Sequence, residues 1–133
     1  MNQASSLPLT GIRVLEFTHM VMGPTCGMIL ADLGAEVIKV EPPGGDKTRR
    51  LPGLGIGFFR SFNRNKKSVV LDITSPEGRQ TAAELAGTCD VVLENFRPGL
   101  MKELGLDYGT LSASYPEMIY VSHKGFLPGP YEK

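Results

Sequence analysis

Short apolar runs alternate with amphipathic segments along this chain, and the alternation predicts strands followed by helices. The first two runs lie at residues 12–17 and 36–40, and their length and branched apolar content are typical of buried parallel strands. Between them, Pro24 suits the first turn of a helix, and Gly34 suits the left-handed residue that ends one. Residues 11–42 therefore predict one strand–helix–strand unit.

The same alternation continues to residue 122. Three further apolar runs predict strands at residues 68–73, 90–94 and 118–122. Helix-boundary residues and helical spacing predict helices at residues 75–87, 100–104 and 107–115. The Gly- and Pro-rich residues 41–57 are too many for a simple connection and predict a functional or poorly ordered loop. Together these elements predict an α/β fold, a Rossmann-like parallel sheet of about five strands with flanking helices and right-handed crossovers.

Polar turns follow three of the predicted strands. They read THMVMGP after the first strand, ENFRPG after the fourth and SHKGF after the fifth. Because ligands of open α/β sheets collect outside the carboxyl ends of the strands, these turns are expected to converge on one site, with His19, Val21 and Met22 as its first candidates. His19 fits a ligand contact and a turn residue satisfied by backbone equally well, whereas His123 is expected to be structural.

Fourteen basic residues balance fourteen acidic ones, so no overall field favours a nucleic acid or an anionic membrane. Any bound anion must therefore be held by a local cluster of cations. The candidate cations are Arg49, Arg50, Arg64, Lys66, Lys67, Arg97 and Lys124. For any one of them, a solvated surface charge is the simpler interpretation.

Several familiar signatures are absent from the sequence. There is no G-x-G-x-x-G after the first strand, no P-loop, and no H-E-x-x-H, C-x-x-C or G-x-S-x-G pattern, so neither an NAD site nor a metal site is expected. Cys26 and Cys89 form no ligand pattern and receive no role. No apolar stretch is long enough to span a bilayer and the first ten residues lack a secretory signal, so we expect a cytoplasmic protein without a membrane partner.

Four segments resemble the amino-terminal part of the class III coenzyme A transferases. They are LPLTGIRVLEFTHMVMGPTCGMILADLGAEVIKVEPPGGD, FNRNKKSVVLDITSPEG, DVVLENFRPGLMKELGLDY and MIYVSHKGFLPGPY. The resemblance implies that residues 1–133 are the amino-terminal part of a CoA-binding large domain, with the small domain and the remainder of the large domain outside this chain. It also implies that the complete protein is an interlocked homodimer.

The resemblance implies coenzyme A, carried as an acyl-CoA substrate, as the ligand of the polar turns. The implied CoA-binding residues come from the turn after the first strand, the segment LDIT and the turn after the fourth strand: His19, Val21, Met22, Leu71, Asp72, Ile73, Thr74, Asn95, Phe96 and Arg97. Phe96 offers a flat face to an adenine or an apolar wall to the pantetheine arm, and a core role is its alternative.

The chain departs from the formyl-CoA-specific members of this family at three positions. Those members carry glutamine where this chain has Val21, and arginine where it has Pro42 and Glu103. The valine favours a larger dicarboxylic or branched acyl group over formyl or oxalyl. The missing arginines shift the expected phosphate contacts to Arg97 or Lys102.

The implied function is the transfer of CoA from an acyl-CoA donor to a carboxylic acid acceptor. In the transferases an aspartate attacks the thioester, and its position lies beyond Lys133, so the 133-residue chain by itself is expected to be inactive. One alternative is an α-methylacyl-CoA racemase, because racemases share the opening segments and their histidine and aspartate also lie beyond Lys133. The other is a noncatalytic CoA-binding module that ends at Lys133.

Overall fold

The computed structural model describes residues 6–126 and 129–130 of the chain, and a five-stranded parallel sheet forms its centre. The strands are β1 (Arg13–Phe17), β2 (Glu36–Glu41), β3 (Lys67–Val70), β4 (Val91–Glu94) and β5 (Ile119–Ser122). Their order across the sheet is β3-β2-β1-β4-β5, and every neighbouring pair is parallel. This confirms the predicted α/β fold.

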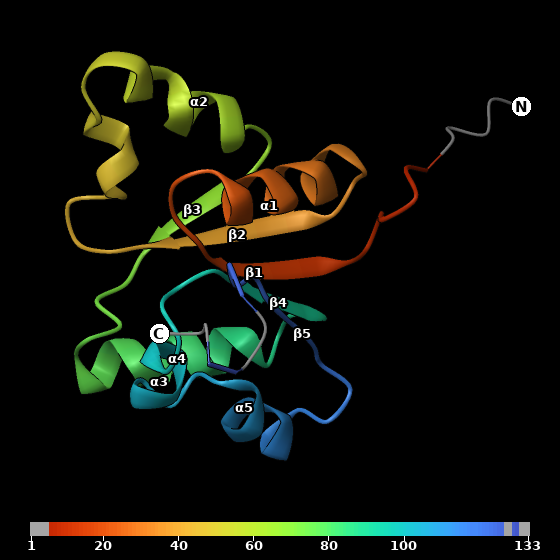
Figure 1. Ribbon diagram of the computed structural model, residues 1–133. Coiled ribbons are helices and arrows are strands. Elements are labelled where there is room, and N and C mark those ends of the chain that lie inside the picture. The colour runs from red at the N-terminus through yellow and green to blue at the C-terminus, as the bar shows by residue number, and fades with distance from the viewer. Residues whose placement is uncertain (1–5, 127–128, 131–133) are drawn as a thin grey trace, which may run out of the picture.

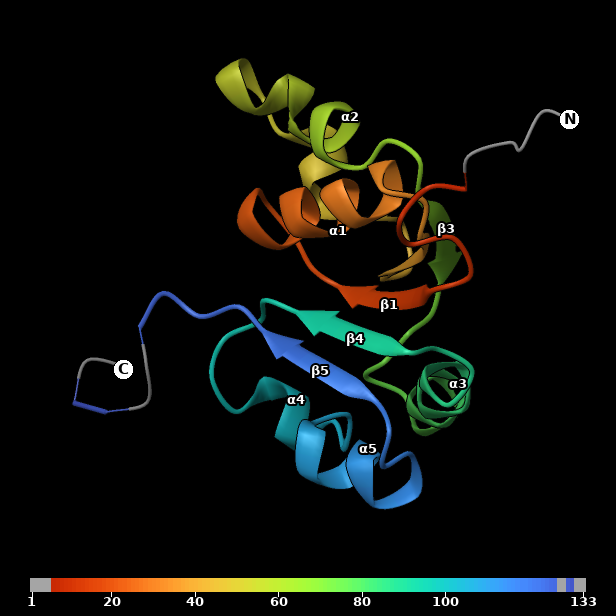
Figure 2. The same ribbon diagram turned by 90° about the vertical axis from the view of Figure 1, so that its right-hand side faces the viewer.

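Helices cover both faces of the sheet. They are α1 (Met22–Asp32), α2 (Phe58–Phe62), α3 (Pro76–Ala86), α4 (Leu100–Glu103) and α5 (Tyr108–Ser114). Figure 1 shows α1 and α2 above the sheet and the other three helices below it, and Figure 2 shows the same two layers from the side. The chain builds outward from β1 to β3 and then crosses to β4 and β5, so the direction of winding switches between β1 and β4.

The central strands are buried because both of their faces are covered. Val14 of β1 packs with Val37 and Leu93 on the α1 side, whereas Leu15 and Phe17 belong to the larger core on the opposite side, as the alternation of side chains along a strand requires. The edge strands β3 and β5 are more exposed. The continuous apolar runs therefore correspond to the central strands, whereas the edge strands mix polar and apolar residues.

Local sequence signals set most helix boundaries. Ser75 caps α3 by accepting a hydrogen bond from the Gly78 amide at 3.0 Å, and Asp107 caps α5 in the same way through the Gly109 amide at 3.2 Å. Gly34 follows α1 with a φ of +104°, which a residue without a side chain adopts at no steric cost. These boundaries agree with the prediction.

The structure differs from the prediction in two places. The expected loop at residues 41–57 contains two 3₁₀ helices, η1 (Lys47–Arg50) and η2 (Gly53–Gly57), and α2 follows directly. The prediction missed them because the order comes from Asp46, whose carboxylate accepts a hydrogen bond from the Thr48 amide at 2.8 Å. β3 ends at Val70, because residues 71–74 form a turn closed by the Thr74 amide on the Asp72 carboxylate at 3.0 Å.

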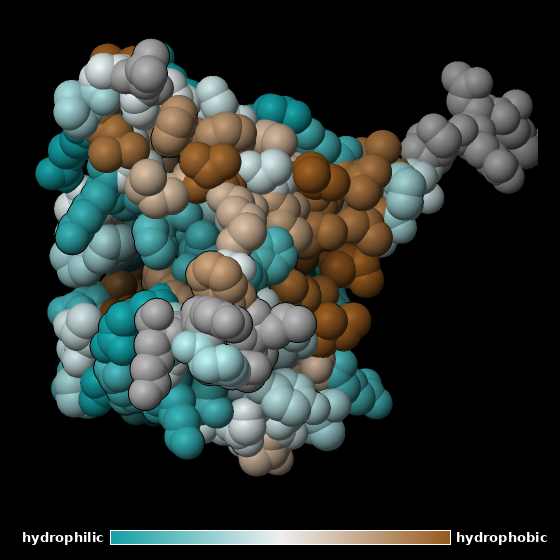
Figure 3. Space-filling model, viewed as in Figure 1, coloured by the Kyte–Doolittle hydropathy of each residue, from teal (hydrophilic) through white to brown (hydrophobic). Residues whose placement is uncertain are grey.

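Surface hydropathy differs between the two ends of the strands. Figure 3 shows apolar side chains gathered over α1 and the strands beneath it, on the side where the chain enters β1. Leu7, Ile29 and Leu33 are among the exposed apolar residues. Within the described residues, no helix combines the length and apolar character needed to cross a membrane.

Candidate functional site

A pocket of about 420 Å³ opens at the carboxyl edge of the sheet, and we call it the β1–β3 pocket. The turns after four strands build it. Its lining residues are Thr18, His19, Met20, Val40, Pro42, Asp46, Lys47, Thr48, Leu51, Leu71, Ile73 and Phe96. The walls are mainly apolar, and Lys47 supplies a cation that has no ion pair among the described residues.

A second pocket of about 270 Å³, the β4–β5 pocket, adjoins the first. Its lining residues come from the turns after β1, β4 and β5: His19, Met22, Asn95, Phe96, Arg97, Pro98, His123, Lys124, Gly125 and Phe126. His19 and Phe96 line both pockets. The predicted convergence of three polar turns on one edge is therefore confirmed.

The turns after β1 and β4 are joined by reciprocal hydrogen bonds. The His19 amide donates to the Asn95 carboxamide oxygen at 2.9 Å, and the Asn95 carboxamide nitrogen donates to the His19 carbonyl at 2.9 Å. The His19 and Phe96 rings lie 5.6 Å apart. Because the backbone of His19 is occupied, its exposed imidazole ring is the part of the residue that remains free for a ligand.

Helix α1 lies close above this junction because its second residue, Gly23, is a glycine. A Cβ atom added at Gly23 would lie 2.7 Å from Thr18 Cβ and 2.8 Å from Asn95 Cγ, closer than carbon atoms approach without displacement. Any side chain at this position would push α1 away from the two joined turns. The absence of a side chain thus brings the start of α1 to the edge of the site.

A buried lysine that the sequence reasoning missed forms part of the floor beneath the β1–β3 pocket. Lys39 of β2 is 1% exposed, donates to the Thr18 carbonyl at 2.6 Å and lies 3.1 Å from Asp46 Oδ2. It therefore joins the turn after β1 to the loop after β2. The only signal in the sequence was a lysine inside the apolar run EVIKV.

A second buried lysine completes this cluster. Lys66 lies 2.9 Å from both carboxylate oxygens of Glu16 and donates to the Pro24 carbonyl at 2.8 Å. Burial lowers the pKa of Lys66, and the neighbouring Glu16 carboxylate opposes that shift. Such pairing is what makes buried charge tolerable, since an isolated ion would lose its hydration without compensation. We call Glu16, Lys39, Asp46 and Lys66 the buried charge cluster.

The seven cations proposed from the sequence as anion binders all have partners in the structure. Their acceptors are Glu41 for Arg49, the Gly44 carbonyl for Arg50, Asp32 for Arg64, Glu16 for Lys66, Glu36 for Lys67, Glu103 for Arg97 and Glu94 for Lys124. These seven residues therefore do not form a single cluster of cations that is free to bind an anion. For Arg64, Lys66, Lys67 and Lys124 the partner is a carboxylate at least thirty positions away in the chain, which a one-dimensional pattern does not reveal.

One of these pairs lies beside the loop after β2. Arg49 Nη2 lies 2.6 Å from Glu41 Oε1, and Arg49 also stacks on the Phe59 ring at 3.7 Å. Burial raises the pKa of Glu41, but hydrogen bonds from Arg49 and the Asp46 amide outweigh it and lower the pKa to about 2. Glu41 therefore stays ionised and fixes the start of this loop.

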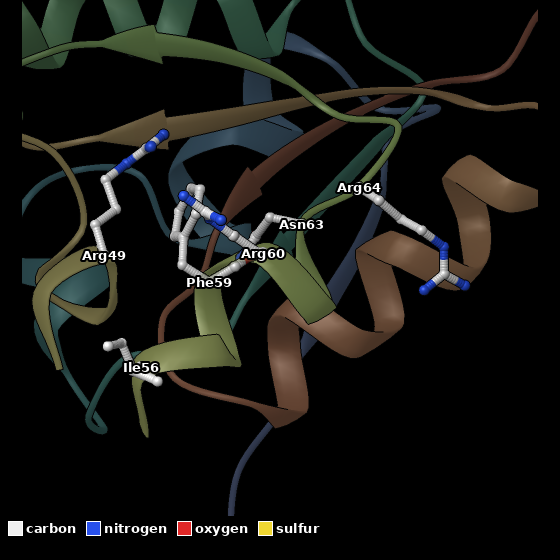
Figure 4. Close-up of a pocket in the computed structure, with 6 residues that line it drawn as sticks. All are labelled: Arg49, Ile56, Phe59, Arg60, Asn63 and Arg64. Atoms are coloured by element: carbon white, nitrogen blue, oxygen red, sulfur yellow. The ribbon is translucent and has the colours of Figure 1, made fainter. Parts of the chain in front are cut away.

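A third pocket, of about 390 Å³, lies against α2, and we call it the α2 pocket. Its lining residues are Arg49, Ile56, Phe59, Arg60, Asn63 and Arg64. In Figure 4, Arg64 stands apart from the other labelled side chains, consistent with its ion pair to Asp32. None of the residues implied as CoA-binding lies in this pocket.

The structure separates the ten implied site residues into three groups. Those in the β1–β3 pocket are His19, Leu71, Ile73 and Phe96, and those in the β4–β5 pocket are His19, Met22, Asn95, Phe96 and Arg97. Val21, Asp72 and Thr74 line neither pocket. The Val21 carbonyl accepts from the Thr25 amide at 2.8 Å in the first turn of α1, and Asp72 closes the turn with Thr74.

The cysteines show no sign of nucleophilic activation. Burial raises the pKa of both Cys26 and Cys89, which disfavours the thiolate. In the part of the chain that the structure describes, no group of three His, Cys, Asp or Glu residues is arranged to hold a metal ion.

Comparisons with known proteins show the family to which the chain is similar. Residues 9–133 match the model of CoA-transferase family III. A formyl-CoA:oxalate CoA-transferase from Rhodopseudomonas palustris is 47% identical over 129 residues, which cover 93% of this chain and 30% of the relative. The chain therefore spans about 30% of the length of the curated relatives it matches.

Solved structures give the same answer for the fold. A hypothetical protein, Rv3272, from Mycobacterium tuberculosis superposes with a TM-score of 0.89 at 47% identity, over 94% of this chain and 36% of that one. A CaiB/BaiF family protein from Brucella suis superposes with a TM-score of 0.87 at 41% identity, over 96% of this chain and 36% of that one.

Proposed function

The chain belongs to CoA-transferase family III, and we propose that it is the CoA-binding, amino-terminal part of an enzyme that transfers CoA from an acyl-CoA to a carboxylic acid. The observation that carries the proposal is the meeting of three polar turns at one sheet edge, where they build two adjoining pockets. Ligands of open α/β sheets bind at this edge, near the point where the winding direction switches.

The β1–β3 pocket suits the adenosine end of CoA. Leu71, Ile73 and Phe96 provide apolar and aromatic surface against which a planar base packs. Lys47 lies in the same pocket and is placed to pair with a phosphate. The seven cations listed above are paired with carboxylates or a carbonyl, and Lys102 of α4 lines neither pocket. Lys47 is therefore the phosphate ligand that this arrangement favours.

The β4–β5 pocket suits the pantetheine arm. Met22, Asn95 and Phe96 line it, and it shares His19 with the neighbouring pocket. An extended ligand that enters the first pocket can therefore continue into the second past the His19 and Phe96 rings. The Asn95–His19 hydrogen bonds hold this junction in one arrangement.

The thioester chemistry needs a carboxylate nucleophile, which attacks the acyl carbonyl and expels the CoA thiolate. The aspartates nearest the pockets are already engaged. Asp46 is bonded to Lys39 and Thr48, and Asp72 to Thr74. On the resemblance to the class III transferases, we propose that the nucleophile lies beyond residue 133, together with the rest of the large domain and the small domain, and that the complete protein is an interlocked homodimer.

Two acyl groups have separate support. The named relatives act on formyl-CoA and oxalate, whereas Val21 favours a bulkier acyl group because it removes a polar partner for a small oxygenated one. The structure places Val21 at the start of α1, beside the site and outside both pockets. We propose the bulkier group, and the Val21→Gln variant described below distinguishes the two.

Titration calorimetry of the full-length protein with CoA, NAD and ATP tests the ligand. We expect CoA to bind and the other two to bind far more weakly, because CoA alone combines a nucleotide end with a long arm for the second pocket. Binding of NAD alone would contradict the proposal.

Two assays on the full-length protein distinguish the remaining functions. Transfer of labelled CoA from an acyl-CoA to an acid is expected of the transferase, and exchange of the α-proton with deuterated water is expected of a racemase. A protein that binds CoA and does neither would be the noncatalytic module.

A further inference from the structure

One buried ion pair holds the peptide groups of Phe96 on both sides. The Phe96 amide donates to Glu94 Oε2 at 2.9 Å. Lys124 Nζ donates to the Phe96 carbonyl at 2.6 Å and lies 2.8 Å from Glu94 Oε1. The Glu94 side chain is 3% exposed and that of Lys124 is 23% exposed, so the pair is largely withdrawn from solvent screening.

Phe96 is the residue whose orientation matters most at this edge. It lines both pockets, and its ring lies 5.6 Å from that of His19. A change in its backbone direction would move the wall that the two pockets share. It would also shift Asn95, which holds the His19 backbone through two hydrogen bonds.

The pair is not needed to join the strands that carry it. β4 and β5 are paired along their length, with Glu94 opposite Ser122. The His123 amide also donates to the Glu94 carbonyl at 2.8 Å, a bond that depends on no side chain. The Glu94 carboxylate also accepts a hydrogen bond from the Ser122 hydroxyl of β5. The other hydrogen bonds of the pair converge on the peptide groups on the two sides of Phe96, which lies two residues beyond the end of β4.

We propose that Glu94 and Lys124 are positioning residues that set the orientation of Phe96 against bound CoA. The inference rests on the proposed function. It gives Lys124 a different role from the one expected from sequence, where it was a candidate anion ligand. Its ammonium group is engaged by Glu94 and by the Phe96 carbonyl, so it acts on the ligand through the aromatic wall.

The test is a double-mutant cycle on the full-length protein, with CoA and dephospho-CoA as the titrated probes. Lys124→Met is expected to weaken the binding of both probes by about 10-fold, and by no more than about 2-fold when Phe96→Ala is already present, since coupled residues act non-additively. A direct contact with the 3′-phosphate would instead weaken CoA alone, a direct contact with the diphosphate would weaken both probes, and either loss would be equal in both backgrounds. That result would overturn the proposal.

Control variants separate positioning from folding. Lys124→Arg keeps the cation and is expected to restore most of the affinity. Arg13→Met removes a partly exposed ion-pair cation at the opposite edge of the sheet and should leave binding unchanged. If Lys124→Met does not fold, Lys124→Arg carries the test, because its small loss must also vanish in the Phe96→Ala background. Additive losses would refute the inference.

If the wild-type protein does not bind CoA, the proposed function fails and this inference fails with it, whereas CoA binding with additive losses removes the inference alone.

Discussion

The β1–β3 pocket and the α2 pocket have similar volumes, about 420 and 390 Å³, but they differ in what their side chains are free to do. Three arginines line the α2 pocket, yet Arg49 is held by Glu41 and Arg64 by Asp32. The β1–β3 pocket has one lysine and mainly apolar walls. The number of cations that line a pocket is therefore a poor guide to the ligand site. The position of a pocket at the carboxyl ends of the strands is a better guide.

The difference follows from how each region is held in place. Exposed ion pairs such as Arg64–Asp32 contribute little to stability, about 0–1 kcal/mol, so the Arg64 side of the α2 pocket is held by a weak contact. The β1–β3 pocket rests on the buried charge cluster, in which the loss of either partner leaves a charge without compensation. Four predictions test this contrast, from the largest expected effect to the smallest.

Breaking the floor of the β1–β3 pocket should have the largest effect. A Cβ atom at Gly27 would lie 1.8 Å from Glu16 Oε2, so Gly27→Ala must displace α1 or break the buried charge cluster. We expect a loss of about 3 kcal/mol or more in the free energy of unfolding, measured with urea. Gly57→Ala near α2 is the matched control, because its nearest neighbouring atom would be 3.9 Å away. Equal losses for the two variants would remove the contrast.

Removing one aromatic ring from each pocket should sharpen the comparison. Phe96→Ala is expected to weaken CoA binding about 30-fold, because a ring that packs against a base contributes about 1–3 kcal/mol. Phe59→Ala removes only the partner of Arg49 and should leave CoA binding within about 2-fold of wild type. Calorimetry on the two variants gives both numbers, and a larger loss for Phe59→Ala would place the ligand in the α2 pocket.

A change at the start of α1 should alter specificity more than affinity. Val21→Gln adds a polar group beside the site, and we expect the preference for formyl or oxalyl substrates over bulkier ones to rise by about 10-fold, roughly 1.4 kcal/mol. The readout is the ratio of kcat/KM values for the two substrates. Val21→Leu is the apolar control and should leave the ratio in place. An unchanged ratio for the glutamine variant would make Val21 a packing residue only.

The last prediction concerns pH and the Glu41–Arg49 pair. The pKa of Glu41 is lowered from 4.5 to about 2 in the folded protein. A carboxyl group with a lowered pKa contributes stability that is present above its unfolded pKa and disappears as the pH falls through the folded value. We therefore expect the melting temperature of the wild type to fall as the pH is lowered from 4.5 to about 2. The melting temperature of Glu41→Gln should depend less on pH over this range. Parallel profiles would show that Glu41 is not the titrating group.

Much of the fold was predictable because its signals are local. The runs that became β1 and β2, the Ser75 cap of α3 and the glycine after α1 each act within a few residues. The convergence of the polar turns also followed, because parallel strands necessarily bring their carboxyl ends to one edge. Local signals failed at residues 41–57, where the order depends on the buried Glu41 and Asp46 carboxylates.

The sequence by itself determined the strand–helix alternation, the family and the edge of the sheet that carries the site, because these depend on short-range patterns of polarity and turn residues. Only the tertiary structure decided which charges are free. Lys66 meets Glu16 across fifty positions of the chain, and Lys124 meets Glu94 across thirty. Whether a lysine is a ligand for phosphate or a buried support depends on whether folding brings a carboxylate beside it. The spacing of residues along the sequence does not show the distance in space between the lysine and that carboxylate.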